Sequence, residues 1–432
     1  MATFAKLPAE MHIEIAGYLD SDGIFALRQT CRVLAKNSHD IFVDRFFRRR
    51  AHIFTKDSVD VLREISASPF ARYVGELQLV GVCKHVSCYG ERSATVTARL
   101  RKRLDDLTSH DGIQLVDIFQ NFQRMSACRS IKVRLRSWYH NSSRPGGYVE
   151  AAIESARSQG IFGAALLLKK LGPDLRGLDL DSRNVESIFD AVNSALALSK
   201  LEANSLNFCY GNGWWGLRWD HLDLTSYKLS LAWEHVRSLR LGFSDLRIPQ
   251  EPLCQAIAKC SNLEWLGLTA FLFELAKPLA NALLSTNISS ISWSVPDTSA
   301  PLRPNGKELC EDFLVKLLPR LKCLRLSRFY LKEGSWRDIC KLLHKGSLEN
   351  LKLSFMAHRD EDNTFAAEAD GCIYHAEGVQ GVDQLLRRLI EHGSHDWDGT
   401  YFDSDADGYF DDEKHSVDVH QKMLSSDCNS GQ

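Results

Sequence analysis

The chain has 432 residues, of which 44% are hydrophobic and 25% are charged, and its formal net charge is -2. This length accommodates two or three domains, or one small module followed by a long repeat array. The balanced charge argues against nucleic acid as a general partner, and the scattered cysteines exclude a small disulfide-bonded scaffold. Without a secretory signal or an apolar run of membrane-spanning length, we expect a soluble intracellular protein of the cytoplasm, the nucleus or both.

Residues 7–47 have the spacing of short amphipathic helices. Pro8 stands where its fixed φ favours the first turn of a helix, and residues 20–23 supply turn and N-cap chemistry for a second helix. The apolar positions of the first helix are Met11, Ile15, Tyr18 and Leu19. Those of the second helix are Ile24, Leu27, Cys31 and Leu34, and a third cluster contains Ile41, Phe42, Phe46 and Phe47. The periodicity alone fits either a docking module or a structural hairpin packed on the rest of the chain.

Three sequence elements of this unit resemble the F-box, the module through which substrate receptors attach to the adaptor subunit of cullin-RING (SCF-type) ubiquitin ligases. They are the start Leu7-Pro8-Ala9-Glu10, the helix-ending Leu19, and the run Leu27-Arg28-Gln29-Thr30-Cys31-Arg32. Residues 46–79 are similar to the segment that follows the F-box in many filamentous-fungal F-box proteins. The resemblance implies an adaptor-binding set of Leu7, Pro8, Glu10, Met11, Ile15, Leu19, Leu27, Cys31 and Leu34.

An internal repeat of the form apolar-x-x-Leu-x-apolar runs through the rest of the chain. Clear copies start at Leu175, Val236, Leu263, Ile288, Leu321 and Leu348, and weaker ones at Val74, Cys128 and Ala203. From Val236 onward the copies start 27, 25, 33 and 27 residues apart, close to the period of about 20 to 29 residues of leucine-rich repeats. A lone strand-loop-helix unit cannot bury its apolar side, so the units should stack, with parallel strands on a concave face and helices outside.

Helical faces are expected between the strands. They are Leu309, Phe313 and Leu317; Trp336, Ile339, Cys340 and Leu343; and Val382, Leu385, Leu386 and Leu389. We therefore predict an α/β fold with a small N-terminal three-helix F-box (residues 4–50), a helical linker (51–70), an irregular leucine-rich-repeat solenoid (71–391) and an acidic, disordered tail (392–432). The repeat region resembles the degenerate leucine-rich repeats of fungal F-box proteins. The rival architecture is an irregular α/β domain in which strands of this pattern are incidental.

Three apparent chemical motifs lack the context that their chemistry needs. Residues 211–216 match the glycine pattern of dinucleotide-binding proteins, but the tryptophans in and beside them indicate a bulky aromatic loop. Cys83 and Cys88 have no second ligand pair at zinc-site spacing. Residues 403–410 match the first eight positions of a calcium-binding EF loop, but Lys414 stands where the bidentate glutamate should be. We expect no catalytic residues, no metal and no cofactor, with calcium binding by the tail as a lesser alternative.

The resemblance implies a non-catalytic receptor subunit. Its F-box would bind the adaptor and, through it, cullin, while the repeat domain would hold a protein substrate for ubiquitin-dependent degradation. The aromatic loop with Trp214, Trp215 and Trp219 is a candidate target contact, although packing against adjacent repeats would explain these side chains too. Two alternatives stay open. They are an adaptor-bound F-box scaffold outside any ligase, and a protein-interaction repeat protein of another kind.

Overall fold

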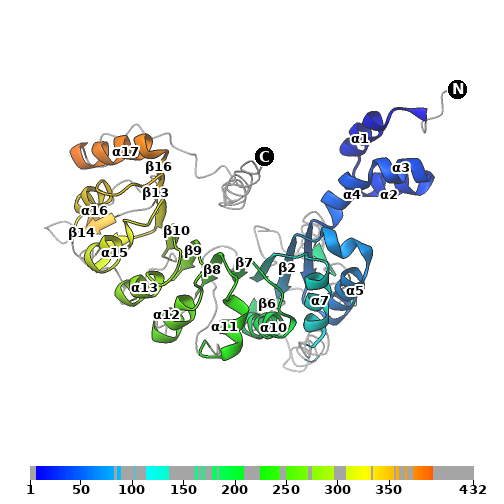
Figure 1. The fold of residues 1–432 in the computed structure, drawn as a ribbon, viewed down its shortest axis with the longest axis horizontal. Helices are drawn as coiled ribbons and strands as arrows, with labels where there is room; N and C mark the ends of the chain where they lie inside the picture. The colour runs from blue at the N-terminus through cyan, green and yellow to red at the C-terminus, as the bar shows by residue number, and fades with distance from the viewer. Residues whose placement is uncertain are drawn as a thin grey trace, which may run out of the picture.

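A computed structural model of the chain describes residues 6–81, 85–88, 102, 113–135, 161–163, 166, 169–170, 178–181, 184–208, 224–243, 250–270, 275–295, 308–331, 334–354, 357–359, 365–366 and 373–392. These residues form a mixed α/β structure with one large, mostly parallel sheet, in agreement with the expected α/β class. In Figure 1 the strands follow the inner side of an arc and the helices follow its outer side.

The large sheet has eleven strands among the described residues, in the order β16-β13-β11-β10-β9-β8-β7-β4-β2-β1-β5. All neighbours from β5 to β13 pair in parallel, whereas β16 pairs with β13 in antiparallel fashion at the far edge. The strands are β1 (Arg49–Ile53), β2 (Glu76–Gly81), β4 (Ser130–Leu135), β5 (Ile161–Phe162), β7 (Ser205–Phe208), β8 (Ser238–Gly242), β9 (Trp265–Thr269), β10 (Ser290–Ser294), β11 (Cys323–Ser327), β13 (Asn350–Ser354) and β16 (Ile373–Glu377).

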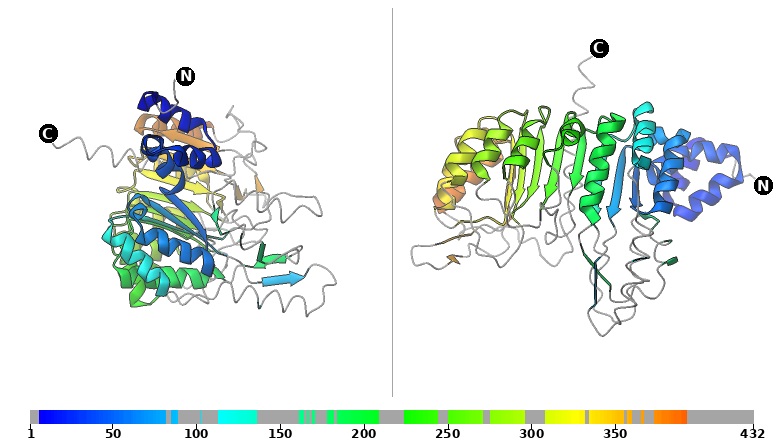
Figure 2. Two further views of the ribbon diagram at one scale, coloured as in Figure 1. Left: turned by 90° about the vertical axis from the view of Figure 1, so that its right-hand side faces the viewer. Right: turned by 90° about the horizontal axis from the view of Figure 1, so that it is seen from below.

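Helices join successive strands and cover the outer face of the sheet (Figures 1 and 2). They are α5 (Lys56–Ala67), the 3-10 helix η2 (Pro69–Tyr73), α7 (Ile113–Arg124), α10 (Asn184–Ser199), α11 (Tyr227–Trp233), α12 (Gln250–Ala258), α13 (Ala276–Leu283), the π-helical η5 (Leu309–Leu314), α15 (Val315–Leu317), α16 (Trp336–Leu343) and α17 (Val379–His392). The three helical faces expected from the sequence are all buried against the sheet. Parallel pairing requires such crossover connections, because each strand must start again from the same edge.

One continuous apolar core lies between the strands and the helices. Partly exposed and buried positions alternate over the first four residues of β2, β7, β8, β11 and β13. In β8, for example, Leu239 and Leu241 are buried while Ser238 and Arg240 are partly exposed. The two strand positions predicted to be buried by the repeat pattern are indeed buried in β2, β4, β7, β8, β9, β10, β11 and β13. Each such leucine contributes about 1.5–3 kcal/mol by leaving water, so the repeat pattern directly encodes the packing of the sheet.

One predicted repeat strand was wrong. The copy that starts at Leu175 contributes β6 (Leu178–Asp181), which pairs antiparallel with β3 (His85–Cys88) in a separate two-stranded sheet. Before β6, the chain has returned from β4 to the opposite edge of the large sheet, where β5 pairs with β1. A third sheet contains β12 (Tyr330–Leu331), β14 (Ala357–Arg359) and β15 (Phe365–Ala366). A local pattern specifies a strand but not its partner, because pairing joins residues distant in sequence.

The N-terminal unit has four helices instead of three, because Cys31 adopts an extended backbone (φ -161°, ψ 163°) that divides the second predicted helix. They are α1 (Ala9–Tyr18), α2 (Ser21–Thr30), α3 (Arg32–Asn37) and α4 (His39–Phe46). The expected helical linker at 51–70 is also different, since β1 belongs to the large sheet and α5 packs on it through the buried Val59 and Leu62. Residues 49–67 are thus a strand-helix unit of the sheet, and the four helices stand at its end (Figure 2).

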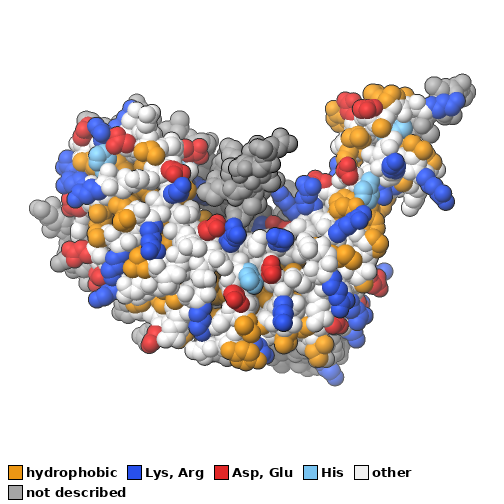
Figure 3. All heavy atoms as spheres, viewed as in Figure 1, with side chains coloured by type: hydrophobic (Ala, Val, Ile, Leu, Met, Phe, Trp, Pro, Cys, Tyr) orange, Lys and Arg blue, Asp and Glu red, His pale blue; other side chains and the backbone are white. Residues whose placement is uncertain are grey.

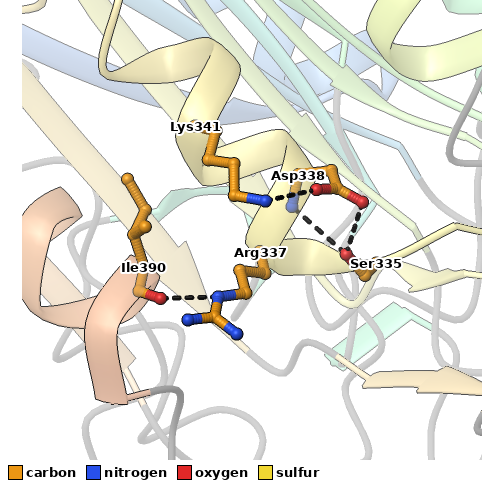
Figure 4. Close-up of polar contacts among 5 residues, drawn as sticks. All are labelled: Ser335, Arg337, Asp338, Lys341 and Ile390. Carbon is orange, nitrogen blue, oxygen red and sulfur yellow. Dashed lines mark hydrogen bonds and ion pairs between the residues drawn. The ribbon is translucent and has the colours of Figure 1, made fainter.

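At the far end of the sheet, α16 and α17 are joined by polar contacts (Figure 4). The hydroxyl of Ser335 caps α16, because it accepts the backbone N–H of Asp338 at 3.2 Å and donates to Asp338 Oδ2 at 2.9 Å. Lys341 donates to Asp338 Oδ1 at 2.9 Å. This hydrogen bond is the main cause that lowers the pKa of Asp338, and the hydrogen bond from Ser335 is the second cause. Arg337 Nε donates to the carbonyl of Ile390 at 2.6 Å, which fixes α16 against the last turn of α17.

Candidate functional site

The N-terminal unit of α1–α4 has its own small core. Leu27 is 8% exposed and Leu34 is 3% exposed, and both pack with Ala16, while Leu19 and Cys31 lie against this cluster. These four members of the expected adaptor-binding set therefore stabilise the helices from within. In α1 the inward-facing residues are His12 and Ala16, so the helix packs on its unit through a face other than the predicted apolar one.

The remaining members of that set lie at the surface of the unit. Pro8, Glu10 and Met11 are exposed, and Leu7 and Ile15 are partly exposed. The sequence pattern missed three other exposed apolar side chains in this unit, which are Ile13, Phe25 and Val33. Tyr18, an apolar position of the first expected helix, is 84% exposed.

We call Met11 and Tyr18 the α1 patch. Met11 is 43% exposed and Tyr18 is 84% exposed, and their spacing of seven residues places them on the same side of α1. Figure 3 shows apolar side chains gathered on the surface of this N-terminal unit. A contiguous exposed apolar surface commonly marks a site that binds another protein, whereas singly exposed apolar residues do not. The α1 patch is therefore the candidate docking surface of the N-terminal unit.

Two arginines of the N-terminal unit, Arg28 and Arg45, hold its helices together. Arg28 donates to the carbonyl of Ala35 at 2.6 Å and lies 4.0 Å from the centre of the Phe42 ring, which ties α2 to α3 and α4. Arg45 on α4 donates to the carbonyl of Leu19 at the end of α1. These bonds hold the four short helices in one arrangement, which their individual lengths could not ensure.

An aromatic joint connects the N-terminal unit to the sheet, and we define it by Phe47, Phe70, His39 and Tyr73. The rings of Phe47 and Phe70 stack with centroids 4.4 Å apart and an interplanar angle of 13°. His39 Nε2 lies 3.1 Å from the Tyr73 hydroxyl. The backbone N–H of Gly75 also donates to the carbonyl of Arg48 at 3.0 Å. The N-terminal unit is thereby packed on η2 and β1, so the aromatic joint resists independent movement of the two parts.

Beside the aromatic joint, His52 on β1 is fully buried. Its Nδ1 lies 3.1 Å from both the carbonyl oxygen and the hydroxyl of Ser58, and its Nε2 lies 3.2 Å from the guanidinium of Arg50. Burial first, and then the Arg50 cation, lower the pKa of His52 to about 3. A neutral ring that donates from Nδ1 and accepts at Nε2 fits all three neighbours. The Ser58 hydroxyl donates to the carbonyl of Phe162 at 3.2 Å, which anchors β5 at this edge.

The second candidate surface is the inner strand face, defined as the strand positions whose side chains point away from the helices. Its central row is aligned by the parallel register and by the final antiparallel pair. In spatial order the central row contains Gln78, Lys132, Asn207, Arg240, Gly267, Ser292, Arg325, Lys352 and His375. Four of these nine residues are lysine or arginine and none is acidic, so the row presents a cationic stripe across the sheet.

An aromatic residue lies beside this stripe. A Cβ placed on Gly267 would be only 2.4 Å from Cη2 of Trp265 and 2.9 Å from Cγ of Arg240. The indole of Trp265 and the alkyl stem of Arg240 therefore lie over the bare backbone of Gly267, and both residues are partly exposed. Trp and Arg are the residue types most enriched among energetically dominant interface residues. The sequence analysis did not identify Trp265 and Arg240 as a pair, because only the strand register shows that both face the inner side next to Gly267.

Several sequence-based expectations fall on other parts of the chain. The loop with Trp214, Trp215 and Trp219, the glycine pattern at 211–216 and the EF-like loop at 403–410 all lie outside the described residues. Within the described ranges, no three His, Cys, Asp or Glu side chains gather as ligands for a metal ion. None of the described helices combines the length and the apolarity needed to cross a membrane.

Comparison with known proteins adds no assignment, since no protein-family model and no curated protein sequence matches the chain. The functional interpretation therefore depends on the two surfaces and on the rigid connection between them.

Proposed function

We propose that this chain is a non-catalytic substrate receptor of a cullin-RING ubiquitin ligase. Its N-terminal unit, an F-box, binds the adaptor subunit, and its sheet domain, a degenerate leucine-rich-repeat array, binds a protein target on the inner strand face. The observation that carries the proposal is the coincidence of two features at α1. The F-box-like start Leu7-Pro8-Ala9-Glu10 leads directly into a helix whose apolar α1 patch faces outward.

The arrangement of the two surfaces supports this function. A receptor raises the local concentration of target lysines near the charged enzyme, so its contribution is positional. Positioning requires that the adaptor-binding and target-binding parts keep a fixed relation. The stacked rings of Phe47 and Phe70 and the polar contact between His39 and Tyr73 supply such a connection.

The test is co-purification of the full chain with the adaptor subunit and cullin. The structure selects Met11→Asp with Tyr18→Asp as the disruptive variant, because both side chains are exposed and their replacement leaves the core intact. A change at Leu19 would be ambiguous, since Leu19 lies against the small core of the unit. Loss of two central apolar anchors is expected to cost about 2 kcal/mol or more, which is roughly thirtyfold in affinity.

The matched control is Leu198→Asp, which places a carboxylate at an exposed apolar position on α10. We expect the parent and this control to retain adaptor and cullin, and the double variant to lose both. Adaptor without cullin would favour a scaffold outside any ligase. A folded parent that binds neither protein would refute the proposal and make α1–α4 a structural unit of a different interaction protein.

A further inference from the structure

We propose that the adaptor comes into close contact with the backbone of α1 at Gly17, so that any side chain at this position would obstruct docking. Gly17 is then a specificity-determining residue of the docking surface. The inference rests on the proposed function, because it concerns how the partner fits the same helix. It follows from the open space at Gly17, from the exposed side chains around it and from their charge.

The first step is the conformation of Gly17. It lies inside α1, and the described glycines with a positive φ are Gly163, Gly334 and Gly378, so its backbone is one that any residue can adopt. Beyond the adjoining residues and the backbone of its own helix, a Cβ built on Gly17 would meet no described atom within 4 Å. Alanine would fit there and would favour the helix more than glycine does. Neither the backbone nor the packing of the described residues therefore requires glycine, whereas a close approach by another molecule does.

The second step is the surroundings of Gly17. Ile13 and Glu14 precede it by four and three residues, so they are its neighbours on the helix surface. Ile13 is 47% exposed, and Glu14 is exposed as well. Glu14 is in turn three residues from Met11 and four from Tyr18, the two residues of the α1 patch. The exposed side of α1 therefore continues from the α1 patch across Glu14 to Gly17 and Ile13.

Gly17 is a gap in the side chains of this surface, next to the apolar side chain of Ile13. Packed helical surfaces fit the projecting side chains of one partner into the gaps of the other. In Figure 1 α1 lies at the end of the N-terminal unit that is remote from the sheet, so the sheet does not cover this side of the helix. The gap fits a large apolar side chain of the adaptor that packs against Ile13.

The third step is the charge of this surface. Glu10 and Glu14 are both exposed, and their spacing of four residues places them on one side of α1. Within the described ranges, neither carboxylate takes part in a hydrogen bond or an ion pair. Glu10 belongs to the first turn, where the helix dipole stabilises a carboxylate, but Glu14 lies beyond that turn. The complementary group is a lysine or arginine of the adaptor opposite Glu14, beside the apolar side chain that fills the gap at Gly17.

The experiment measures, on the full-length chain, the affinity for the purified adaptor by calorimetry and the urea midpoint by circular dichroism. Gly17→Ala should keep or raise the urea midpoint, because alanine is the better helix former. It should nevertheless weaken adaptor binding by about tenfold or more, because the added methyl group overpacks a close contact. The matched control is Gly381→Ala in the first turn of α17, where the new Cβ would meet Ala376 Cβ at an ordinary 3.9 Å. This control should also keep or raise the midpoint, and it should bind the adaptor as the parent does.

A second pair of variants tests the charge. Glu14→Lys should slow association with the adaptor, and the difference from the parent should shrink as salt is raised. Glu64→Lys makes the same change at an exposed position on α5 and should associate as the parent does.

The outcomes separate this inference from the receptor function. Equal adaptor affinity of the parent and Gly17→Ala would overturn the inference and leave the receptor function intact. A weaker affinity together with a lower urea midpoint would also overturn it, because the glycine would then be required by the fold. A folded parent that binds no adaptor would overturn both.

Discussion

Replacement of His52 by asparagine should remove a large part of the acid sensitivity of the fold. In the native structure the ring is fully buried between Ser58 and the Arg50 guanidinium. A second proton on the ring would face that cation at 3.2 Å and would have no water to solvate it. Burial and then Arg50 lower the pKa of His52 to about 3, whereas an unfolded histidine titrates near about 6.5.

The sign of the effect follows from these two values. Below about pH 6.5 the unfolded chain binds a proton that the folded chain does not bind until the pH approaches the folded value, so the unfolded state gains stability as the pH falls. The stabilising contribution is fully present above the unfolded pKa and is lost progressively below it. Between about pH 7.5 and about pH 4.5, His52 alone should lower the free energy of unfolding by about 2.5 kcal/mol.

The assay is urea denaturation followed by circular dichroism at these two pH values, for the parent, for His52→Asn and for His235→Asn. Other titrating groups contribute equally to all three proteins, so the difference between them isolates one ring. The free energy of unfolding of His52→Asn should change less between the two pH values than that of the parent. The variant His235→Asn, at an exposed position, should change as much as the parent does. Equal pH shifts for the parent and His52→Asn would refute the reasoning, as would a His52 ring resonance that titrates near about pH 6.5.

Three other outcomes are expected. Phe70→Ala removes the stack on Phe47, worth about 0.5–1.5 kcal/mol, so amide hydrogen exchange in α4 should accelerate roughly two- to tenfold while that of β9 is unchanged. Leu266→Ala, at a fully buried position of β9, should lower the free energy of unfolding by about 2–5 kcal/mol in urea titrations. Gly163→Ala should destabilise the fold by about 1–3 kcal/mol, because φ is +85° and the new Cβ would lie 2.8 Å from Ser58 Cβ; an unchanged urea midpoint would contradict this.

The sequence by itself determined the local elements and which of their residues are buried. The pair Leu239 and Leu241 shows why, since alternation with partly exposed neighbours is a property of any strand packed on one face. The buried face of α16 follows in the same way from helical spacing. Asp20 likewise accepts the backbone N–H of Gly23 at 2.7 Å at the start of α2, as its position predicts.

Only the tertiary structure decided how these elements combine. Leu27 and Tyr18 both occupy apolar positions of helical patterns, yet Leu27 is buried in the small core and Tyr18 faces outward, because periodicity marks an apolar face without specifying what covers it. The segment at Leu178 likewise forms a strand outside the large sheet. The cationic row exists only through register, which brings Arg240 and Arg325, 85 residues apart in sequence, into one line across the sheet. Strand alignment is a non-local choice, made by the packing of the whole core.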